Sequence, residues 1–226
     1  MAAAGARGLA SRDRDRALSR RRAQVELTAV LSALGDGEGD DLDRRVLDAA
    51  EALLRSSGLR RWSVDDVADR ADVGRTSVYR RFGGRDDLVH AVLARELRAT
   101  LAAISRAAAA QPDLEGKAVA SVAAAVAALD GSVVDCLLRS DPATFLPFLT
   151  TEAGPLVAIA RATITAQVSA LGPPPSPELA EAAARLGLSF VLTRESVLPV
   201  DDPVALDAAV RRMVRPFLLA FGAAVT

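Results

Sequence analysis

A short run of hydrogen-bond donors occupies residues 75–82, where the chain reads RTSVYRRF. Arginine can donate two parallel hydrogen bonds to the edge of a guanine base, and hydroxyl groups donate to bases or to phosphates. Val78 and Phe82 are the residues of this run that suit a core. The other side chains are expected to point outward, where their donors could contact a nucleic acid: Arg75, Thr76, Ser77, Tyr79, Arg80 and Arg81.

Two helical patterns precede this run and would position it. The first ends near Gly58 and repeats apolar residues at the helical period, namely Val46, Leu47, Ala50, Leu53 and Leu54. The second begins at Ser63, a favourable N-cap residue, with Asp66 at the third helical position as an acidic form of the capping box. Local residue chemistry therefore marks the end of the first helix and the start of the second.

An aromatic residue, Trp62, precedes the cap of the second helix. Trp62 and Val67 are spaced as a hydrophobic staple around the cap of the second helix. We therefore expect Trp62, like Phe82, to lie in the core rather than to stack on a base.

The residues between the second helix and the donor run form a turn. They read ADVG at positions 71–74, where Asp72 tolerates the left-handed conformation of a sharp turn and Gly74 can cap the next helix. Two short helices joined by such a turn predict a helix-turn-helix, which places its second helix in the major groove of DNA.

The segment ADVGRTSVYRRFGGRDDL resembles the signature of TetR-family (tetracycline-repressor-like) transcriptional regulators. The matching positions are Ala71, Val73, Tyr79, Phe82, Arg85 and Leu88. Two positions depart from the pattern, because Asp72 replaces the customary turn glycine and Gly74 replaces the customary serine. These departures affect the turn geometry and one phosphate-binding hydroxyl, and they leave the motif in place.

The resemblance implies a set of DNA contacts. Ser63, Tyr79 and Arg85 would contact phosphates, while the remaining donors would face base edges or the adjacent backbone. The ordinary alternative for each arginine is a solvated surface charge. The expected DNA-binding set is Ser63, Arg75, Thr76, Ser77, Tyr79, Arg80, Arg81 and Arg85.

The chain is expected to fall into three parts. Residues 1–40 form a basic N-terminal extension and flexible linker, residues 41–86 the helix-turn-helix domain, and residues 87–226 an all-helical effector-binding and dimerisation domain. The arginine-rich stretch 12–22 has two interpretations, an arm that follows phosphates or enters the minor groove, and a loosely docked tail.

Helical patterns with proline and glycine breaks fill the rest of the sequence, and no convincing strand pattern occurs. Helices are expected at 85–109, 113–130, 154–170, 178–198 and 203–221, with a short element after Asp141-Pro142 and a kink at Pro216. The fold class is therefore all-α: a three-helix DNA-binding domain followed by a helical bundle.

The resemblance further implies a homodimer on a palindromic operator in double-stranded DNA, since a two-fold dimer matches two half-sites. Apolar stripes on the last two helices would form the dimer interface, although the same stripes could simply close the core of one chain. The expected interface residues are Leu186, Phe190, Val197, Leu206, Val210, Met213, Phe217 and Phe221, of which Leu206 and Phe221 complete the stripe on the last helix.

An effector pocket is also implied by the resemblance, and mostly aliphatic walls would suit a small apolar molecule. Each candidate could equally be an ordinary core residue: Leu97, Leu101, Ile104, Val122, Phe145, Phe148, Ile159 and Phe190. Arg161 and Arg194 could anchor an anionic ligand, and a surface salt bridge is the competing interpretation for both.

Composition favours a cytoplasmic protein without cofactor. No apolar run approaches the roughly 20 residues of a membrane span, and the N-terminus lacks the order of a signal peptide. A single cysteine, Cys136, excludes a disulfide framework and suits the core better than a redox sensor. The net charge of −1 gives by itself no sign of a nucleic-acid partner.

Catalysis is the competing class of function. His90 is the only histidine and has no second histidine or nearby cysteine with which to bind a metal. The DVGRTS segment also lacks the lysine and spacing of a phosphate-binding loop. We therefore expect no enzyme and no metal site, and predict a repressor released by a small apolar effector. The alternatives are a DNA-binding regulator without effector or a helical enzyme.

Overall fold

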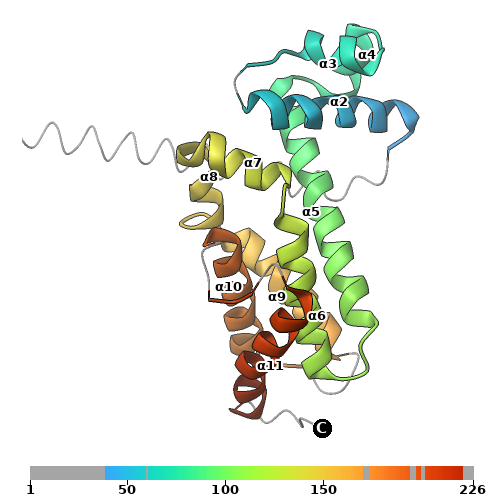
Figure 1. Cartoon of the computed structure of the whole chain (residues 1–226). Helices are drawn as coiled ribbons and strands as arrows, with labels where there is room; N and C mark the ends of the chain where they lie inside the picture. The colour runs from blue at the N-terminus through green and yellow to red at the C-terminus, as the bar shows by residue number, and fades with distance from the viewer. Residues whose placement is uncertain (1–38, 60, 170–173, 194–196, 200–201, 221–226) are drawn as a thin grey trace, which may run out of the picture. The chain divides into compact units, whose positions relative to one another are not determined.

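The computed structural model describes residues 39–59, 61–169, 174–193, 197–199 and 202–220. All regular elements in these ranges are α-helices, which confirms the all-α class (Figure 1). The basic stretch 12–22, Arg194 and Phe221 lie outside the described residues. The chain divides into two compact units. Of the described residues, unit 1 comprises those up to Ala94 together with Ser140–Ala153, and unit 2 comprises Arg95–Arg139 and those from Gly154 onward.

Unit 1 begins with α2 (Asp41–Ser57). The side chain of the N-cap residue Asp40 accepts a hydrogen bond from the backbone of Asp43, and Gly58 ends the helix at a φ of 66°, in the region that favours glycine. The expected end at Gly58 is confirmed. The helix buries the apolar face that the sequence predicts, which includes Val46, Ala50 and Leu54.

The next two helices form the helix-turn-helix. In α3 (Val64–Ala71), Ser63 and Asp66 make both hydrogen bonds of the capping box, as the sequence predicts. The helix packs on α2, and α4 (Arg75–Phe82) follows after a short turn and packs on α3 (Figure 1). Trp62 is buried beside the cap, so its expected core position is also confirmed.

The helix α5 (Arg85–Ala109) has the bounds that the sequence predicts, and the division between the units falls inside it. Unit 1 also contains α8 (Pro142–Leu149), which begins with proline at its first position. The domain boundary expected at 86/87 stays a prediction.

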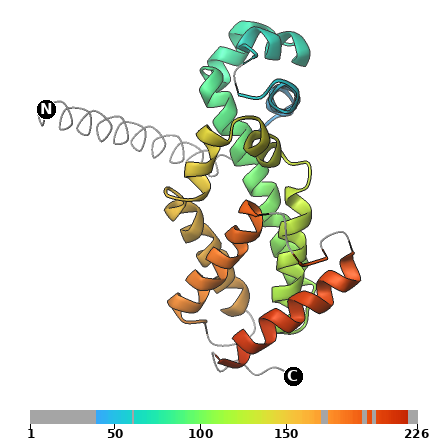
Figure 2. The ribbon, with the colours of Figure 1, turned by 60° about the vertical axis from the view of Figure 1, so that its left-hand side comes forward.

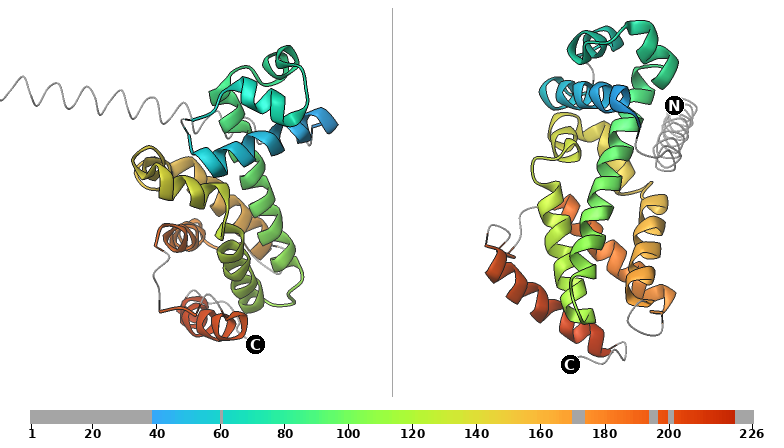
Figure 3. Two further views of the ribbon diagram at one scale, coloured as in Figure 1. Left: turned by 45° about the horizontal axis from the view of Figure 1, so that its top comes forward. Right: turned by 90° about the vertical axis from the view of Figure 1, so that its right-hand side faces the viewer.

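Unit 2 holds the remaining helices. The helix α10 (Pro177–Leu192) packs against α9 (Gly154–Ser169) and α6 (Leu114–Leu129), and α11 (Pro203–Ala220) packs against α6 (Figures 2 and 3). The expected helix at 178–198 is too long, because Thr193 adopts an extended conformation that ends α10.

One helix was not expected from the sequence, α7 (Val133–Ser140). It is too short for a periodic apolar face to stand out. Its start carries a local signal, since the Ser132 hydroxyl accepts a hydrogen bond of 3.0 Å from the backbone of Asp135. A Ser-x-x-Asp sequence of this kind could have located it.

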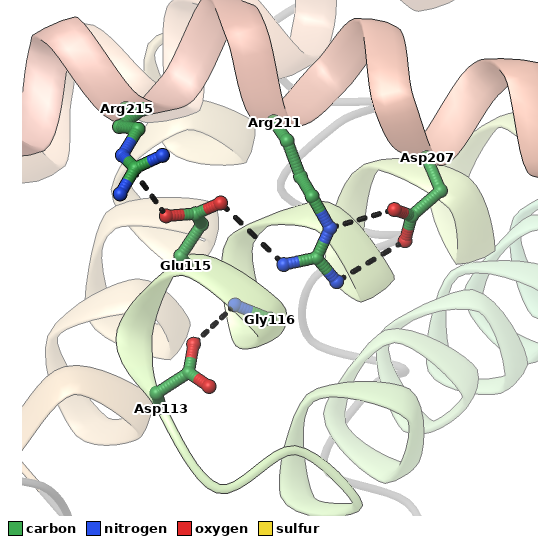
Figure 4. Close-up of polar contacts among 6 residues, drawn as sticks. All are labelled: Asp113, Glu115, Gly116, Asp207, Arg211 and Arg215. Atoms are coloured by element: carbon green, nitrogen blue, oxygen red, sulfur yellow. Dashed lines mark hydrogen bonds and ion pairs between the residues drawn. The ribbon is translucent and has the colours of Figure 1, made fainter. Parts of the chain in front are cut away.

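The contact between α6 and α11 combines a small apolar core with an ionic border. Val119, Leu206 and Val210 are buried together. Beside them, Glu115 of α6 lies 3.5 Å from Arg211 and 3.9 Å from Arg215, both on α11 (Figure 4). These contacts fix α11 on unit 2.

No single helix within the described ranges is both long and apolar enough to cross a membrane. Two bent pairs meet the criterion by length and composition only, namely Leu114–Leu129 with Val133–Ser140 and Pro142–Leu149 with Gly154–Ser169.

Candidate nucleic-acid interface

The surface of α4 carries the donors predicted from the sequence. Val78 is its one fully buried side chain, whereas Arg75, Thr76 and Arg80 are exposed. Tyr79 exposes 42% of its surface. A helix of eight residues is not stable alone in water. Contacts with the neighbouring helices therefore hold α4 in its helical conformation.

The turn before α4 is fixed from α2. Asp72 adopts the left-handed conformation (φ 53°, ψ 55°), as the sequence predicts. Arg45 donates from Nη2 to the carbonyl oxygens of Ala71 and Asp72, at 2.5 and 2.7 Å. The last carbonyl groups of a helix lack partners within it, so Arg45 satisfies two of them and holds the turn. Sequence reasoning missed this residue.

At the start of α4, Arg75 lies between two side chains. Its Nε atom is 2.8 Å from Oδ1 of Asp65 on α3, with the geometry of an ion pair rather than of a hydrogen bond. Its guanidinium carbon lies 5.3 Å from the centre of the Tyr79 ring. The Tyr79 hydroxyl and the Asp65 carboxylate together raise the pKa of Arg75. Arg75 is therefore held in place at the exposed surface of α4.

Arg81, at the other end of α4, is engaged inside unit 1. Nη2 donates to Oδ2 of Asp43 at 2.6 Å and to Oδ2 of Asp40 at 3.1 Å. These two carboxylates raise the pKa of Arg81, with Asp43 as the larger cause. The Asp43 side chain is only 12% exposed. Arg81 thus ties the end of α4 to the start of α2.

Gly39 lies beside the Asp43 carboxylate with which Arg81 pairs. A Cβ atom at position 39 would come within 2.0 Å of the Asp43 carboxylate, so only glycine fits there. The chain therefore enters α2 directly beside the Arg81 ion pair.

Arg85, at the start of α5, is docked on Trp62. Its Nε atom donates to the Trp62 carbonyl oxygen at 3.1 Å, and its guanidinium carbon lies 4.8 Å from the centre of the indole ring. The Nη2 atom is buried and has no hydrogen-bond partner among the described residues. This arrangement joins α5 to the segment before α3 and includes the unusually favourable pairing of a cation with tryptophan.

The hydroxyl group of Ser63 is also committed locally. It donates to Oδ2 of Asp66 at 2.8 Å and accepts from the Asp66 backbone at 3.3 Å. Because a hydroxyl has one hydrogen, a phosphate would have to compete with Asp66 for it.

The expected effector-pocket residues are divided between the two units. Phe145 and Phe148 belong to unit 1, where their rings meet edge to face at 5.8 Å. The side chain of Phe190 lies outside the described residues. The others belong to unit 2 and are half-buried: Leu97, Leu101, Ile104, Val122 and Ile159. Arg161 pairs with Glu181 at 3.3 Å, which is the competing interpretation given for it.

The expected dimer residues also differ in their surroundings. Val210 is fully buried within the chain, in the core between α6 and α11, and Met213 packs at its edge. Leu186 and Val197 are exposed, by 43% and 101%. The side chains of Phe190 and Phe217 lie outside the described residues. Val210 therefore fits the alternative interpretation, in which the apolar stripe closes the core of one chain.

A helix-turn-helix unit with an exposed donor face, followed by helices in a second unit, is an architecture typical of helical DNA-binding regulators. Residues 46–92 match the family model described as "Bacterial regulatory proteins, tetR family". The match confirms the resemblance to TetR-family regulators over the helix-turn-helix and the start of α5.

Solved structures share the fold of this chain. The TetR-family repressor AlkX from Dietzia sp. strain DQ12-45-1b, implicated in biodegradation of n-alkanes, is 24% identical, with a TM-score of 0.57 over 78% of this chain and 97% of that one. A transcriptional regulator from Rhodococcus sp. Rha1 is 20% identical, with a TM-score of 0.54 over 81% and 99%.

A third similar structure is the fatty acid degradation regulator FadR from Bacillus halodurans. It is 14% identical, with a TM-score of 0.51 over 79% of this chain and 96% of that one. No curated protein matches the chain. These likenesses show a shared fold.

Proposed function

We propose that the protein is a cytoplasmic, dimeric, sequence-specific DNA-binding repressor that a small apolar effector releases. The observation that carries the proposal is the composition of α4, which buries Val78 and exposes a row of donors after a fixed turn. Arg75, Thr76, Ser77 and Arg80 would contact base edges and nearby backbone, and Tyr79 would contact a phosphate. Ser63, Arg81 and Arg85 would reach phosphates only by exchanging their partners within unit 1.

Dimerisation would supply the second recognition helix that a palindromic operator requires, with half-sites about 34–36 Å apart. The exposed apolar residues Leu186, Val197 and Val204 are the described surface that best supports an interface in unit 2. Sedimentation of wild type and Leu186→Glu tests this proposal. A dimer that becomes monomeric supports it, with Val210 excluded from the contact because it is already buried.

The effector would bind among half-buried aliphatic side chains of unit 2, such as Leu101, Ile104 and Ile159. Two proteins of similar fold carry names that refer to alkane and fatty-acid degradation, so an n-alkane and a long-chain fatty acid are suitable first probes. Because α5 continues from unit 2 into unit 1, a ligand that shifts α5 would reach the DNA-binding helices through one helix. The coupling expected of such systems is roughly 5- to 150-fold in operator affinity.

Selection of bound sequences from random duplex DNA tests the function directly. The proposal expects a palindromic site and a preference over unrelated duplex of about 10³-fold or more. Binding without preference would indicate a sequence-indifferent protein, and a specific site that no probe releases would support a regulator without effector. A protein that binds no duplex would contradict the proposed function and favour the enzyme alternative.

The basic stretch 12–22 would act as an arm on the DNA backbone if the first of its two interpretations holds. A shortened protein that begins at Gly39 would then show weaker binding and a smaller dependence of affinity on salt, because fewer counterions are released. Equal affinity and equal salt dependence would identify the stretch as a tail.

A further inference from the structure

We propose that Asp65 determines sequence specificity by holding Arg75 for a guanine in each half-site. This inference rests on the proposed DNA-binding function and adds to it a residue that does not itself read the base. The observation behind it is the ion pair across the helix-turn-helix, in which Asp65 on α3 meets the first residue of α4.

The pair contributes little to folding. Its two side chains are 50% and 62% exposed, and ion pairs in such solvated positions stabilise proteins weakly. A carboxylate in this position also repels the phosphates of any bound duplex. An acidic residue that adds little stability and opposes DNA binding in general is best explained by what it does to Arg75.

Arg75 is restrained from two sides. The Asp65 carboxylate faces its Nε atom, and the Tyr79 ring lies under the guanidinium at 5.3 Å. A restrained guanidinium loses less side-chain freedom when it donates to a guanine, so binding to the right base becomes tighter. With Nε turned toward Asp65, the planar group can offer its terminal nitrogens to the O6 and N7 atoms of guanine.

Asp65 also penalises wrong sequences. Where the base is not guanine, Arg75 finds no matched pair of acceptors and the carboxylate remains close to the DNA. Specificity is a difference between affinities, and a repulsive group that is offset only at the correct site increases that difference.

The test compares four full-length proteins: wild type, Asp65→Asn, Arg75→Ala and the double variant. Each is used in selection from random duplex DNA and in competition with unrelated duplex. In wild type we expect one guanine per half-site preferred by about 10-fold or more, the range for a bidentate arginine contact. Asp65→Asn should reduce this preference several-fold and bind unrelated duplex more tightly, with little effect at other positions.

Two control variants separate positioning from charge. Asp69→Asn removes the same charge four residues further along the same face of α3, from an exposed position. It should leave the guanine preference unchanged. Asp65→Glu keeps the carboxylate and should retain most of the preference. Thermal melting of each variant shows that the differences arise in folded protein.

The double variant decides between two roles. If Asp65 acts through Arg75, then Asp65→Asn changes the base preference no further once Arg75 is alanine. Independent effects of the two changes, or loss of a cytosine preference in Asp65→Asn, would mean that Asp65 reads a base itself and would overturn the inference. An unchanged motif in Asp65→Asn would overturn it too. A wild type that selects no motif would instead refute the proposed function.

Discussion

Arg81 of α4 donates a hydrogen bond of 2.6 Å to the carboxylate of Asp43 on α2. Arg81 follows Arg80 in a run that the sequence predicts to face DNA, and both are exposed to solvent. Their surroundings separate them, because Arg81 neutralises a carboxylate that is almost buried. Removal of one partner from such a pair leaves the other charge uncompensated.

We predict that Arg81→Ala lowers the melting temperature, whereas Arg80→Ala leaves it nearly unchanged and mainly weakens DNA binding. The Asp43 carboxylate already has one oxygen, Oδ1, buried without a hydrogen bond among the described residues, so loss of Arg81 makes its burial costlier. Thermal melting by circular dichroism checks the prediction. The change Asp43→Asn in the Arg81→Ala protein should recover part of the loss. Equal melting temperatures for the two arginine variants would contradict it.

The packing of Arg85 on Trp62 gives a second prediction. Arg85→Ala removes a cation–π contact worth about 0.5–2 kcal/mol and the hydrogen bond to the Trp62 carbonyl oxygen. We expect lower stability and a red shift of tryptophan fluorescence, since Trp62 is the single tryptophan and is buried.

Arg85→Lys is the matched control for this experiment. Lysine keeps the charge but cannot reproduce the Nε hydrogen bond together with the stacked guanidinium. If Arg85 serves mainly by docking on Trp62, the lysine variant should be destabilised as well. A lysine variant with wild-type stability and fluorescence would favour a role confined to phosphate binding.

The features of unit 1 that the sequence predicts correctly depend on residues close together in the chain. Ser63 and Asp66 are three residues apart, and the left-handed Asp72 follows from its own residue type and the turn around it. Local hydrogen bonding decides such features, so they are visible in a sequence. The bounds of α5 follow for the same reason.

The contacts that sequence reasoning missed join residues 23 to 38 positions apart: Arg85 with Trp62, Arg45 with Ala71, and Arg81 with Asp43. In each case an arginine looks the same in a sequence whether it faces solvent, DNA or a neighbouring helix. Only the packing of the helices supplies the acceptor. Val210 illustrates the same limit, because an apolar stripe does not reveal whether a second helix or a second chain covers it.

Asp72 provides a third prediction. The change Asp72→Val should destabilise unit 1 clearly, since a β-branched residue strongly disfavours a φ of 53°. Asp72→Gly should alter stability little, because relief of the left-handed conformation is offset by the greater freedom of glycine in the unfolded chain. Both variants keep the backbone carbonyl oxygens of residues 71 and 72, to which the Arg45 side chain donates. Chemical denaturation checks the order, and a valine variant as stable as the glycine variant would contradict it.

The capping box gives a pH-dependent prediction. Hydrogen bonds from the Ser63 hydroxyl and backbone lower the pKa of Asp66 below its ordinary value of 3.8. The bound carboxylate therefore adds stability above the pKa of the unfolded chain, and that stability is lost as the pH falls through the lower folded pKa. Asp66→Asn should lower the melting temperature at pH 7, and the difference from wild type should shrink below about pH 4. Asp69→Asn, which removes a carboxylate of the same helix outside the capping box, is the charge-matched control.

Val210 allows a final prediction that separates the core of one chain from a dimer interface. Its side chain is fully buried with Val119 and Leu206, so Val210→Ala leaves a cavity between α6 and α11 and should cost about 2 kcal/mol. Because the contact lies within one chain, the loss should be the same at every protein concentration. Val204→Ala, at an 81% exposed position of α11, is the control and should leave the monomer as stable as wild type. A destabilisation by Val210→Ala that grows on dilution would instead place this residue between two chains.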